Sequence, residues 1–453
     1  MDNLNVCLIN DSFPPVIDGV ATAVCNYARI ITEKHGRAAV FTPYYPDADD
    51  SQYAFPVYRY PSLDLSKQVG YRAGIPFSPK LMGTVKDAGF DIIHSHCPVS
   101  STLLARSLRE TLDVPVVMTY HTKFDIDIAN AVQGKLVQAE MIQLLVKNID
   151  ACDEVWTVSR GAGENLRSLG FDKPYVIMPN GVDFPKGRVS EELVQEVTGG
   201  LDLPAGVPVL LFVGRMMWYK GIRIILDALK TLDDEGRVFR MVFVGGGGDA
   251  AEIHAYAEEL SLMDKVFFVE PIRDRDRIRA WYCRADLFLF PSTFDTNGLV
   301  VREAAACALP SVLVRGSCAA EDSTDGVTSF LIEENAQSMA AMLRRLLTEP
   351  ECIRRVGEAA QQDLYLSWED AVDNACRGYA AVIENYRSGR YPRHDTPTDE
   401  IIHRLTKAME WVDQAELLRD LREPPRSSEE LLALLRRRRD PLGQSFHRPD
   451  RFL

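Results

Sequence analysis

Short apolar runs alternate with segments of helical periodicity along most of this sequence, and this alternation restricts the fold more than any other feature. In the first half, the runs that we expect to be strands are residues 4–10, 38–42, 91–96, 114–121, 154–159 and 175–179. Helical patterns such as residues 100–112 and 134–148 separate them. Strands that alternate with helices of this length indicate a parallel sheet covered on both faces.

The alternation begins again after a polar stretch with glycine and proline that ends near Pro208. The strands expected there are residues 209–213, 241–244, 266–269, 287–290, 311–314 and 329–332. We therefore predict two Rossmann-like, doubly wound α/β domains, over residues 1–195 and 196–366. We expect the carboxyl ends of both strand sets to face one central cleft, because open α/β sheets bind ligands at that edge.

The sequence past Tyr391 predicts a helical tail over residues 391–453. Ile401, Leu405, Met409 and Val412 fall on one face of its first helix, and residues 431–439 form a second helix that ends in four arginines. Such a run is most often a solvated helix end that interacts favourably with the helix dipole. The alternative is contact with a membrane surface or a partner.

Composition excludes several classes of protein. The net charge of −14 argues against a general nucleic-acid binder, because no basic surplus is present to displace counterions. Nine cysteines without a CxxC pair indicate neither a disulfide framework nor a zinc site. Strand-like sequence from Leu4 leaves no room for a signal peptide, and no apolar run approaches membrane-spanning length. We expect a reduced, cytoplasmic setting.

Residues 291–310 carry the strongest functional pattern. An apolar strand leads into a polar loop, and Gly298 then opens an alanine-rich helix bracketed by Asp295 and Glu303. A helix N-terminus offers free N–H groups to phosphate, and carboxylates accept hydrogen bonds from sugar hydroxyls. This combination suits a nucleotide-sugar, although an ordinary helix cap with two solvated acids gives the same pattern.

Two cations follow the first strand of the second domain. Arg215 and Lys220 lie in the segment GRMMWYKG, residues 214–221, at the carboxyl end of that strand. A guanidinium and an ammonium suit a departing diphosphate, whose charge grows as the bond breaks. Two cations in a loop are usually only surface charges, but a strand's carboxyl end favours the functional interpretation.

Two residues of the first domain also follow predicted strands and are candidates for the site. Gly19 precedes a helix and would let the backbone approach phosphate or sugar closely. His121 ends the predicted strand 114–121, where a histidine is as often functional as structural.

Two other patterns receive weaker interpretations. The run Gly245–Gly248, between a strand and a helix, superficially matches a dinucleotide fingerprint, but we favour a tight turn over NAD binding. The acidic pairs Asp125/Asp127 and Asp274/Asp276 lack supporting ligands, so we predict solvated loops and no metal site.

Together these segments resemble the retaining glycosyltransferases of family 4, which have the two-domain GT-B fold. Residues 214–221 resemble the family's G-R-x(n)-K-G loop, and residues 295–303 resemble its E-x7-E motif. Other matching segments fall in the family's order, namely residues 13–20, 94–96, 119–122, 158–159 and 179–183. The resemblance covers roughly residues 4–387.

The resemblance implies a role for each candidate. Arg215 and Lys220 would hold the donor diphosphate, and Glu303 would bind the nucleotide ribose. Amides of Asn297, Gly298, Leu299 and Val300 would meet phosphate and sugar. Asp295 and His121 would contact the transferred sugar, and Gly19 would close on the donor. A helix over residues 367–387 would cross back to complete the first domain, and neither a metal nor another cofactor is expected.

Two residues depart from the family pattern. Asp295 replaces the first glutamate of the motif and has a shorter reach, and Asp18 stands where a second glycine is common. We expect sugar transfer from a UDP- or GDP-linked donor, with retention, to a hydroxyl acceptor.

Residues 119–122 resemble the corresponding stretch of bacterial transferases that act on diacylglycerol-type lipids. That resemblance and the basic tail suggest a membrane glycerolipid acceptor and contact with the inner face of the membrane. A soluble saccharide or small-molecule acceptor, or a nucleotide-sugar-binding protein without turnover, are the alternatives.

Overall fold

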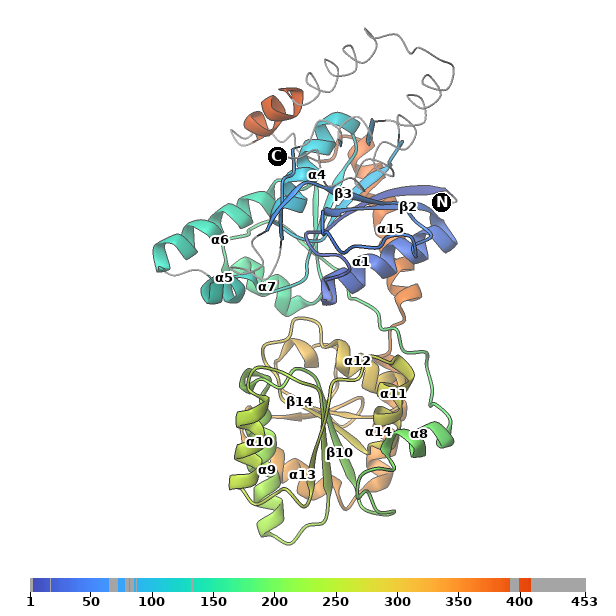
Figure 1. Ribbon diagram of the computed structural model, residues 1–453, viewed down its shortest axis with the longest axis vertical. Helices are drawn as coiled ribbons and strands as arrows, with labels where there is room; N and C mark the ends of the chain where they lie inside the picture. Colours follow the sequence, from blue (N-terminus) through green and yellow to red (C-terminus); the bar gives the residue numbers. More distant parts are fainter. Residues whose placement is uncertain are drawn as a thin grey trace. The chain divides into compact units, whose positions relative to one another are not determined.

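The computed structural model in Figure 1 describes residues 3–16, 18–64, 72–77, 81, 85–86, 88–131, 134–391 and 399–408. The chain divides into two compact units. Unit 1 comprises Met1–Val158, Gly163–Met178 and Val372–Leu453, and unit 2 comprises Ser159–Ala162 and Pro179–Ala371. Each unit contains a parallel sheet with helices against it, so the prediction of two α/β domains is confirmed.

Among the described residues, the main sheet of unit 1 has the strand order β3-β2-β1-β6-β7-β8-β9, with parallel neighbours. Its strands are β1 (Leu4–Ile9), β2 (Gly36–Pro43), β3 (Val57–Tyr60), β6 (Ile92–Ser95), β7 (Val116–Tyr120), β8 (Glu154–Thr157) and β9 (Val176–Ile177). An antiparallel pair, β4 (Ser62–Asp64) and β5 (Arg72–Gly74), lies outside it. This pair was not predicted, because its strands are short and largely polar.

The helices of unit 1 cover two faces of its sheet. They are α1 (Gly19–Ile30), which continues into a π-helical turn (Ile31–His35), α4 (Ser100–Leu112), α5 (Phe124–Ala131), α6 (Lys135–Asp150) and the greater parts of α7 (Arg160–Ser168) and α15 (Trp368–Arg387). Neighbouring residues of β6 show the two faces. The His94 ring contacts Tyr27 of α1 and Tyr379 of α15, whereas Ser95 Oγ lies 2.9 Å from Thr102 Oγ1 of α4.

In the described residues of unit 2, the strand order is β12-β11-β10-β13-β14-β15, again parallel. These strands are β10 (Val209–Val213), β11 (Arg240–Val244), β12 (Val266–Val269), β13 (Leu287–Phe290), β14 (Ser311–Val314) and β15 (Phe330–Ile332). Strands such as β13, with the sequence LFLF, are buried throughout. Continuous apolar runs of this kind are typical of strands covered on both faces.

The helices of unit 2 lie on both sides of that sheet, with α9 and α10 on one side and α11 and α14 on the other (Figure 1). Their bounds are α8 (Glu191–Thr198), α9 (Ile222–Asp234), α10 (Ala250–Glu259), α11 (Arg275–Arg284), α12 (Leu299–Ala306), α13 (Ala336–Leu346) and α14 (Pro350–Asp363). Polar side chains cap several of them. For example, Asp274 accepts hydrogen bonds from the first amides of α11, and Asn335 caps α13.

The units divide at Met178 and Pro179, whereas we expected a domain boundary at 195/196. The reason lies in packing, since Val182, Phe184 and Val194 belong to the hydrophobic core of unit 2. The chain crosses back within α15, where residues from Val372 onward cluster with unit 1.

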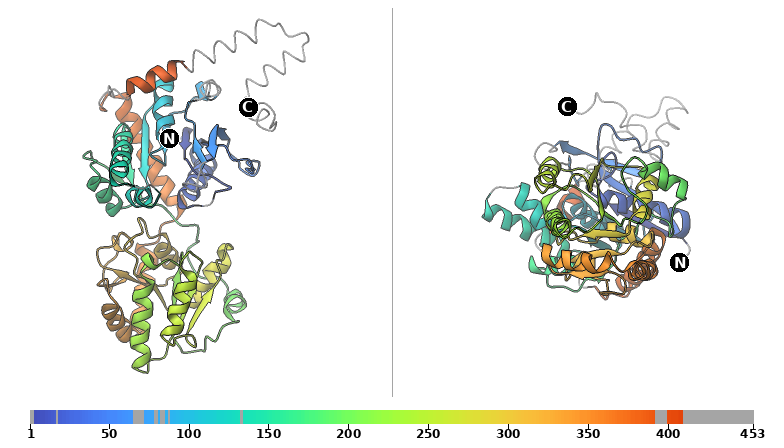
Figure 2. Two further views of the ribbon diagram at one scale, coloured as in Figure 1. Left: turned by 60° about the vertical axis from the view of Figure 1, so that its left-hand side comes forward. Right: turned by 90° about the horizontal axis from the view of Figure 1, so that it is seen from below.

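The described part of the tail forms a helix over residues 399–408 that packs on α4 (Figure 2). Asp399 and Arg106 form an ion pair at 2.6 Å with both side chains buried, and Thr406 Oγ1 lies 2.6 Å from Ser107 Oγ. Ile402 of this helix is buried. Ile401 and Leu405, which lie on the apolar face that we predicted, are exposed. Met409, Val412 and residues 431–439 lie outside the described residues.

Candidate functional site

The loop that carries Arg215 and Lys220 packs directly against the glycine run that follows β11. Gly245 has φ +146°, and a Cβ there would lie 2.0 Å from the Gly214 carbonyl oxygen. A Cβ on Gly247 would lie 2.5 Å from the Met216 carbonyl oxygen. These glycines are therefore required for backbone-to-backbone packing beneath the Arg215 loop.

The same loop is fixed at its far end. Asp249, which follows the glycine run, accepts a hydrogen bond from the Trp218 amide at 2.8 Å. Gly221 ends the loop with φ +78°, and a Cβ there would lie 2.4 Å from the Pro291 carbonyl oxygen. Close contact with Pro291 brings the loop next to the segment that contains Asp295.

Lys220 is a cation placed inside the protein rather than on its surface. The residue is 7% exposed, and its Nζ lies 5.7 Å from the ring centroid of Tyr219 and 5.8 Å from that of Phe290. Its partner is Asp295, whose Oδ1 lies 2.5 Å from Nζ. Aromatic faces and one carboxylate together make a buried ammonium tolerable.

Both carboxylate oxygens of Asp295 accept hydrogen bonds from other side chains. Oδ1 accepts from Lys220, and Oδ2 accepts from the Ser292 hydroxyl at 2.6 Å. The shorter side chain, compared with the glutamate of the family motif, is thus held against the lysine. Arg215 is exposed, with its guanidinium carbon 5.9 Å from the ring centroid of Tyr219.

Helix α12 begins four residues after Asp295 and has no side-chain cap. Gly298 occupies the position before it with φ +58°, and a Cβ there would lie 3.0 Å from the Cα atom of Ala319. The left-handed conformation and the close approach both require glycine. No side chain occupies the first amides of α12; the Val301 amide donates to the Gly298 carbonyl at 2.8 Å, and the start of the helix suits an anion.

Glu303 lies on the second turn of α12 and is held by two residues of α11. Its Oε1 accepts from Arg275 at 2.6 Å, and its Oε2 accepts from the Tyr282 hydroxyl at 2.9 Å. Burial and the charge of Glu303 raise the pKa of Tyr282 well above its usual value. Burial lowers the pKa of Arg275, but the Glu303 carboxylate outweighs it, so the pKa is raised overall. Arg275 and Tyr282 were missed, because only tertiary packing brings α11 and α12 together.

In unit 1, Gly19 is the first residue of α1. Asp18 caps this helix by accepting hydrogen bonds from the amides of Val20 at 2.9 Å and Ala21 at 2.7 Å. A Cβ on Gly19 would meet no atom within 4 Å. The fold therefore does not require glycine at this position, in contrast to Gly298.

His121 follows β7 and forms a buried pair with a histidine that follows β6. His96 Nδ1 lies 2.9 Å from His121 Nε2. Burial lowers the pKa of His121 to about 3, and burial together with the neighbouring histidines lowers the pKa of His96 well below its usual value. His96 was given no role from the sequence. Alternation could have indicated one, because His94 and His96 share a face of one strand, as Thr119 and His121 do of the next.

The structure thus gathers most of the predicted site in unit 2. Arg215, Lys220 and Asp295, together with Glu303 and the start of α12, follow the ends of β10 and β13. Asn297, Leu299 and Val300 flank Gly298 there. Gly19 and His121 belong to unit 1, where Gly19 opens the helix after β1 and His121 directly follows β7; β6 lies between these two strands.

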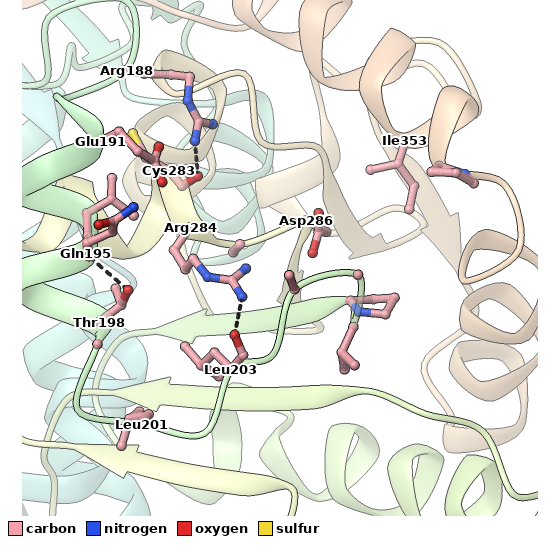
Figure 3. A pocket seen from close by; sticks show the side chains of 18 of the residues that line it. Arg188, Glu191, Gln195, Thr198, Leu201, Leu203, Cys283, Arg284, Asp286 and Ile353 are labelled. Carbon is pink, nitrogen blue, oxygen red and sulfur yellow. Dashed lines mark hydrogen bonds between the residues drawn. The ribbon is translucent and has the colours of Figure 1, made fainter.

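Unit 2 also contains a cavity of about 1020 Å³ at the opposite edge of its sheet (Figure 3). Pro208 and Asp286, which line it, precede β10 and β13 rather than follow them. Its arginines bind backbone, since Arg188 donates to the Cys283 carbonyl at 2.6 Å and Arg284 to the Leu203 carbonyl at 3.0 Å. The cavity is separate from the site around Lys220.

Three of the four residues of the two acidic pairs have partners within the protein. Asp274 caps α11, Asp276 pairs with Arg279 at 3.0 Å, and Asp125 Oδ1 lies 3.3 Å from Asn165 Nδ2. No group of three His, Cys, Asp or Glu side chains suited to a metal ion occurs in the described part of the chain. Within the same residues, no helix has the length and apolar character needed to cross a bilayer.

Two protein families match this chain. The profile of the family described as "Glycosyltransferase Family 4" matches residues 17–185, and that of "Glycosyl transferases group 1" matches residues 196–363. The second match includes the whole Lys220, Asp295 and Glu303 cluster.

Curated relatives of this chain are also glycosyltransferases by name. The chain is 26% identical over 319 residues to alpha-monoglucosyldiacylglycerol synthase of Streptococcus pneumoniae, covering 68% of this chain and 70% of that protein. It is 29% identical over 322 residues to D-inositol 3-phosphate glycosyltransferase 2 of Catenulispora acidiphila, covering 67% and 73%.

Solved structures share the fold. Anabaena HepE in complex with UDP has a TM-score of 0.67 at 18% identity, covering 83% of this chain and 100% of that one. Sucrose-phosphate synthase from Thermosynechococcus elongatus has a TM-score of 0.66 at 21% identity, covering 84% and 100%. Both family profiles, the relatives and the fold lead to one conclusion: the chain belongs to the GT-B glycosyltransferases of the family 4 type.

Proposed function

We propose that the enzyme transfers a sugar from a nucleoside diphosphate sugar to a hydroxyl acceptor with retention at the anomeric carbon. The observation that carries the proposal is the buried Lys220 ammonium, held by Asp295 just before the uncapped start of α12. A cation and free helix amides placed together suit a diphosphate leaving group. Arg215 adds a second cation from the same loop.

Each remaining residue of the cluster has a role in this proposal. Glu303, held by Arg275 and Tyr282, accepts hydrogen bonds from the ribose hydroxyls of the donor. Amides of Asn297, Gly298, Leu299 and Val300 bind phosphate and sugar. Asp295 orients Lys220 and, through the remaining lone pairs of its oxygens, accepts a hydrogen bond from the transferred sugar. Gly19 and His121 of unit 1 contact the donor and the sugar.

The chemistry needs no protein nucleophile. The glycosidic bond to phosphate breaks through an oxocarbenium-like transition state, and the acceptor hydroxyl attacks on the face that the phosphate leaves. The departing phosphate oxygen accepts the hydroxyl proton. Arg215 and Lys220 stabilise the charge that grows on the diphosphate, so that positioning and charge stabilisation supply most of the rate. We propose that these cations take the place of a metal, and transfer that persists in EDTA would support this.

Donor identity is tested by thermal stabilisation. UDP- and GDP-sugars are screened for an increase in Tm, because a ligand that binds only the folded state stabilises it by mass action. The positive donors are then assayed for transfer and for hydrolysis, with the anomeric configuration of the product determined by NMR. We expect a sugar product of unchanged configuration. Donor binding with neither transfer nor hydrolysis, across a broad acceptor panel, would instead support a nucleotide-sugar-binding protein.

For the acceptor, we propose a membrane glycerolipid, which the name of the Streptococcus pneumoniae relative and the arginine run of the tail support. Flotation with vesicles that contain anionic lipid and diacylglycerol tests it. The full chain is compared with a chain that ends at Ala408, because an earlier end would leave Arg106 buried without Asp399.

We expect the full chain to float and to glycosylate the lipid at the inner face of the cytoplasmic membrane. Substitution of Arg436–Arg439 by glutamine is the matched control for the charge. No flotation by any form, combined with transfer to soluble sugars, would favour a soluble saccharide or small-molecule acceptor.

A further inference from the structure

The two histidines at the end of β6, His94 and His96, differ in the hydrogen bonds that their ring nitrogens form. His94 has a partner at each ring nitrogen, with Nδ1 2.5 Å from the Tyr379 hydroxyl and Nε2 2.7 Å from Thr119 Oγ1. His96 has His121 at Nδ1, but its buried Nε2 has no hydrogen-bond partner in the part of the chain that the structure describes. An unpaired buried polar atom lowers the stability of the folded state and calls for an explanation.

Packing holds the His96 ring in place. The residue is 1% exposed, and its ring centroid lies 3.9 Å from that of His94 and 5.3 Å from that of Tyr27. The planes of the His96 and His121 rings are inclined by only 25°, with the ring centroids 5.2 Å apart. His96 is therefore a rigid element whose hydrogen bond is directed at His121.

Both imidazoles of this pair are neutral near pH 7, because burial lowers the pKa of His121 to about 3 and that of His96 well below its usual value. A hydrogen bond between two neutral imidazoles has one donor and one acceptor, so the two tautomers are coupled. If His121 donated from Nε2, the proton of His96 would lie on Nε2 as a buried N–H without a partner. If His96 donates from Nδ1, its Nε2 carries only a lone pair.

The second arrangement is favoured, because buried N–H groups without partners are rarer in folded proteins than acceptors without partners. We propose that His96 is a positioning residue that fixes His121 in the tautomer protonated at Nδ1. His121 then acts as a hydrogen-bond donor at Nδ1 in a single ring orientation. The significance for catalysis rests on the proposed function, in which His121 contacts the transferred sugar.

The tautomer is measured directly in the free protein. The full chain is labelled with ¹⁵N-histidine, and long-range ¹H–¹⁵N spectra distinguish protonated from bare ring nitrogens. His121 is assigned from the resonance that is lost in His121→Gln. We expect the proton of His121 on Nδ1 and a mixture of tautomers in His96→Phe. A proton on His121 Nε2 in the unchanged protein would overturn the proposal whether or not sugar transfer occurs.

Activity separates positioning from mere packing. His96→Asn keeps an amide donor close to the place of Nδ1, whereas His96→Gln carries the same amide one methylene further out. We expect His96→Phe and His96→Gln to lower kcat by about tenfold to a hundredfold, as loss of an orienting partner commonly does, with little change in donor KM. His96→Asn should recover kcat to within a few fold.

A packing role alone would lower Tm in step with activity and would give Asn and Gln variants of equal kcat, which would overturn the proposal. If His96→Phe does not fold, the comparison of Asn with Gln decides the question. An unchanged protein without turnover on any UDP- or GDP-sugar would refute the proposed function instead, while the NMR spectrum still tests the tautomer.

Discussion

Helix α1 begins at Gly19 and α12 begins directly after Gly298, each following a strand of a parallel sheet, yet the two helix starts differ in their caps and in the space around the glycine. The first amides of α1 are taken by Asp18, and its Gly19 has open space where a Cβ would be. Helix α12 has no side-chain cap, and its Gly298 is left-handed and pressed against Ala319. At α12 the backbone requires glycine, and no side chain accepts from the first amides of the helix. At α1 the Asp18 side chain accepts from the amides of Val20 and Ala21.

Under the proposed function, this comparison assigns the donor phosphate to the start of α12 and predicts that charge matters most there. Lys220→Ala or Arg215→Ala removes a cation beside this start and should lower kcat by about a hundredfold, which corresponds to about 3 kcal/mol of transition-state stabilisation. Steady-state kinetics with the donor found in the thermal screen measures the change.

The matched control is Lys230→Ala, because Lys230 pairs with Asp234 on the exposed side of α9. Its kcat should stay near that of the unchanged enzyme. Near-normal turnover in both the Lys220 and Arg215 variants would remove the basis for placing the diphosphate at α12.

The two glycines provide the next test. Gly298→Ala forces a left-handed alanine toward Ala319 and should lower the free energy of unfolding by about 1–3 kcal/mol. Gly19→Ala meets no atom within 4 Å and should change stability by less than about 0.5 kcal/mol, while it raises donor KM. Denaturant unfolding and donor kinetics of both variants measure these effects. Equal losses of stability would contradict the distinction between the helix starts.

Sequence alone predicted the architecture because the strongest local signals agreed with it. Wholly apolar runs such as β10 and β13 are buried on both faces, and the structure places them at the centre of the sheet in unit 2. The pair β4 and β5 escaped prediction because its short polar strands have no apolar periodicity. The predicted boundary at 195/196 differs from the division at Met178, because packing of Phe184 and Val194 on unit 2 leaves no mark on composition, although the second family profile begins at residue 196.

The sequence motifs identified several residues of the candidate site, but not the contacts between them. Arg215, Lys220 and Asp295 were identifiable as charges at strand ends, but the ion pair between Lys220 and Asp295 depends on the pairing of β10 with β13. Arg275 and Tyr282 are ordinary residues of α11 until the fold places them against Glu303. The cap at Asp18 is local, since an aspartate just before a helix is a common N-cap, and its departure from the family's glycine could have been explained in that way.

Acid should affect unit 1 through the buried His121. Its pKa in the folded state is about 3, below the usual value near 6.5, so the unfolded state binds more protons between these limits. The stability that this histidine contributes is complete above pH 6.5 and falls by about 1.4 kcal/mol per pH unit as the pH decreases toward 3. Unfolding measured from pH 7 to pH 5 should show a slope that contains this contribution and those of His94 and His96, whose pKa values burial also lowers, and His121→Phe should reduce the slope by the equivalent of about one proton. An unchanged slope in the variant would contradict the buried neutral imidazole.

The smallest effect concerns the carboxylate at the start of α1. Asp18→Ala removes the cap and should lower the free energy of unfolding by about 1 kcal/mol, whereas Asp18→Asn keeps an acceptor for the amides of Val20 and Ala21 and should cost less. If Gly19 approaches the donor diphosphate, the loss of a negative charge in Asp18→Asn should also lower donor KM by about two- to fivefold at low salt, and by less at high salt. Kinetics at two ionic strengths measure this. A donor KM that is the same in Asp18→Asn and the unchanged enzyme at both would mean that the phosphate is bound by the start of α12 without help from α1.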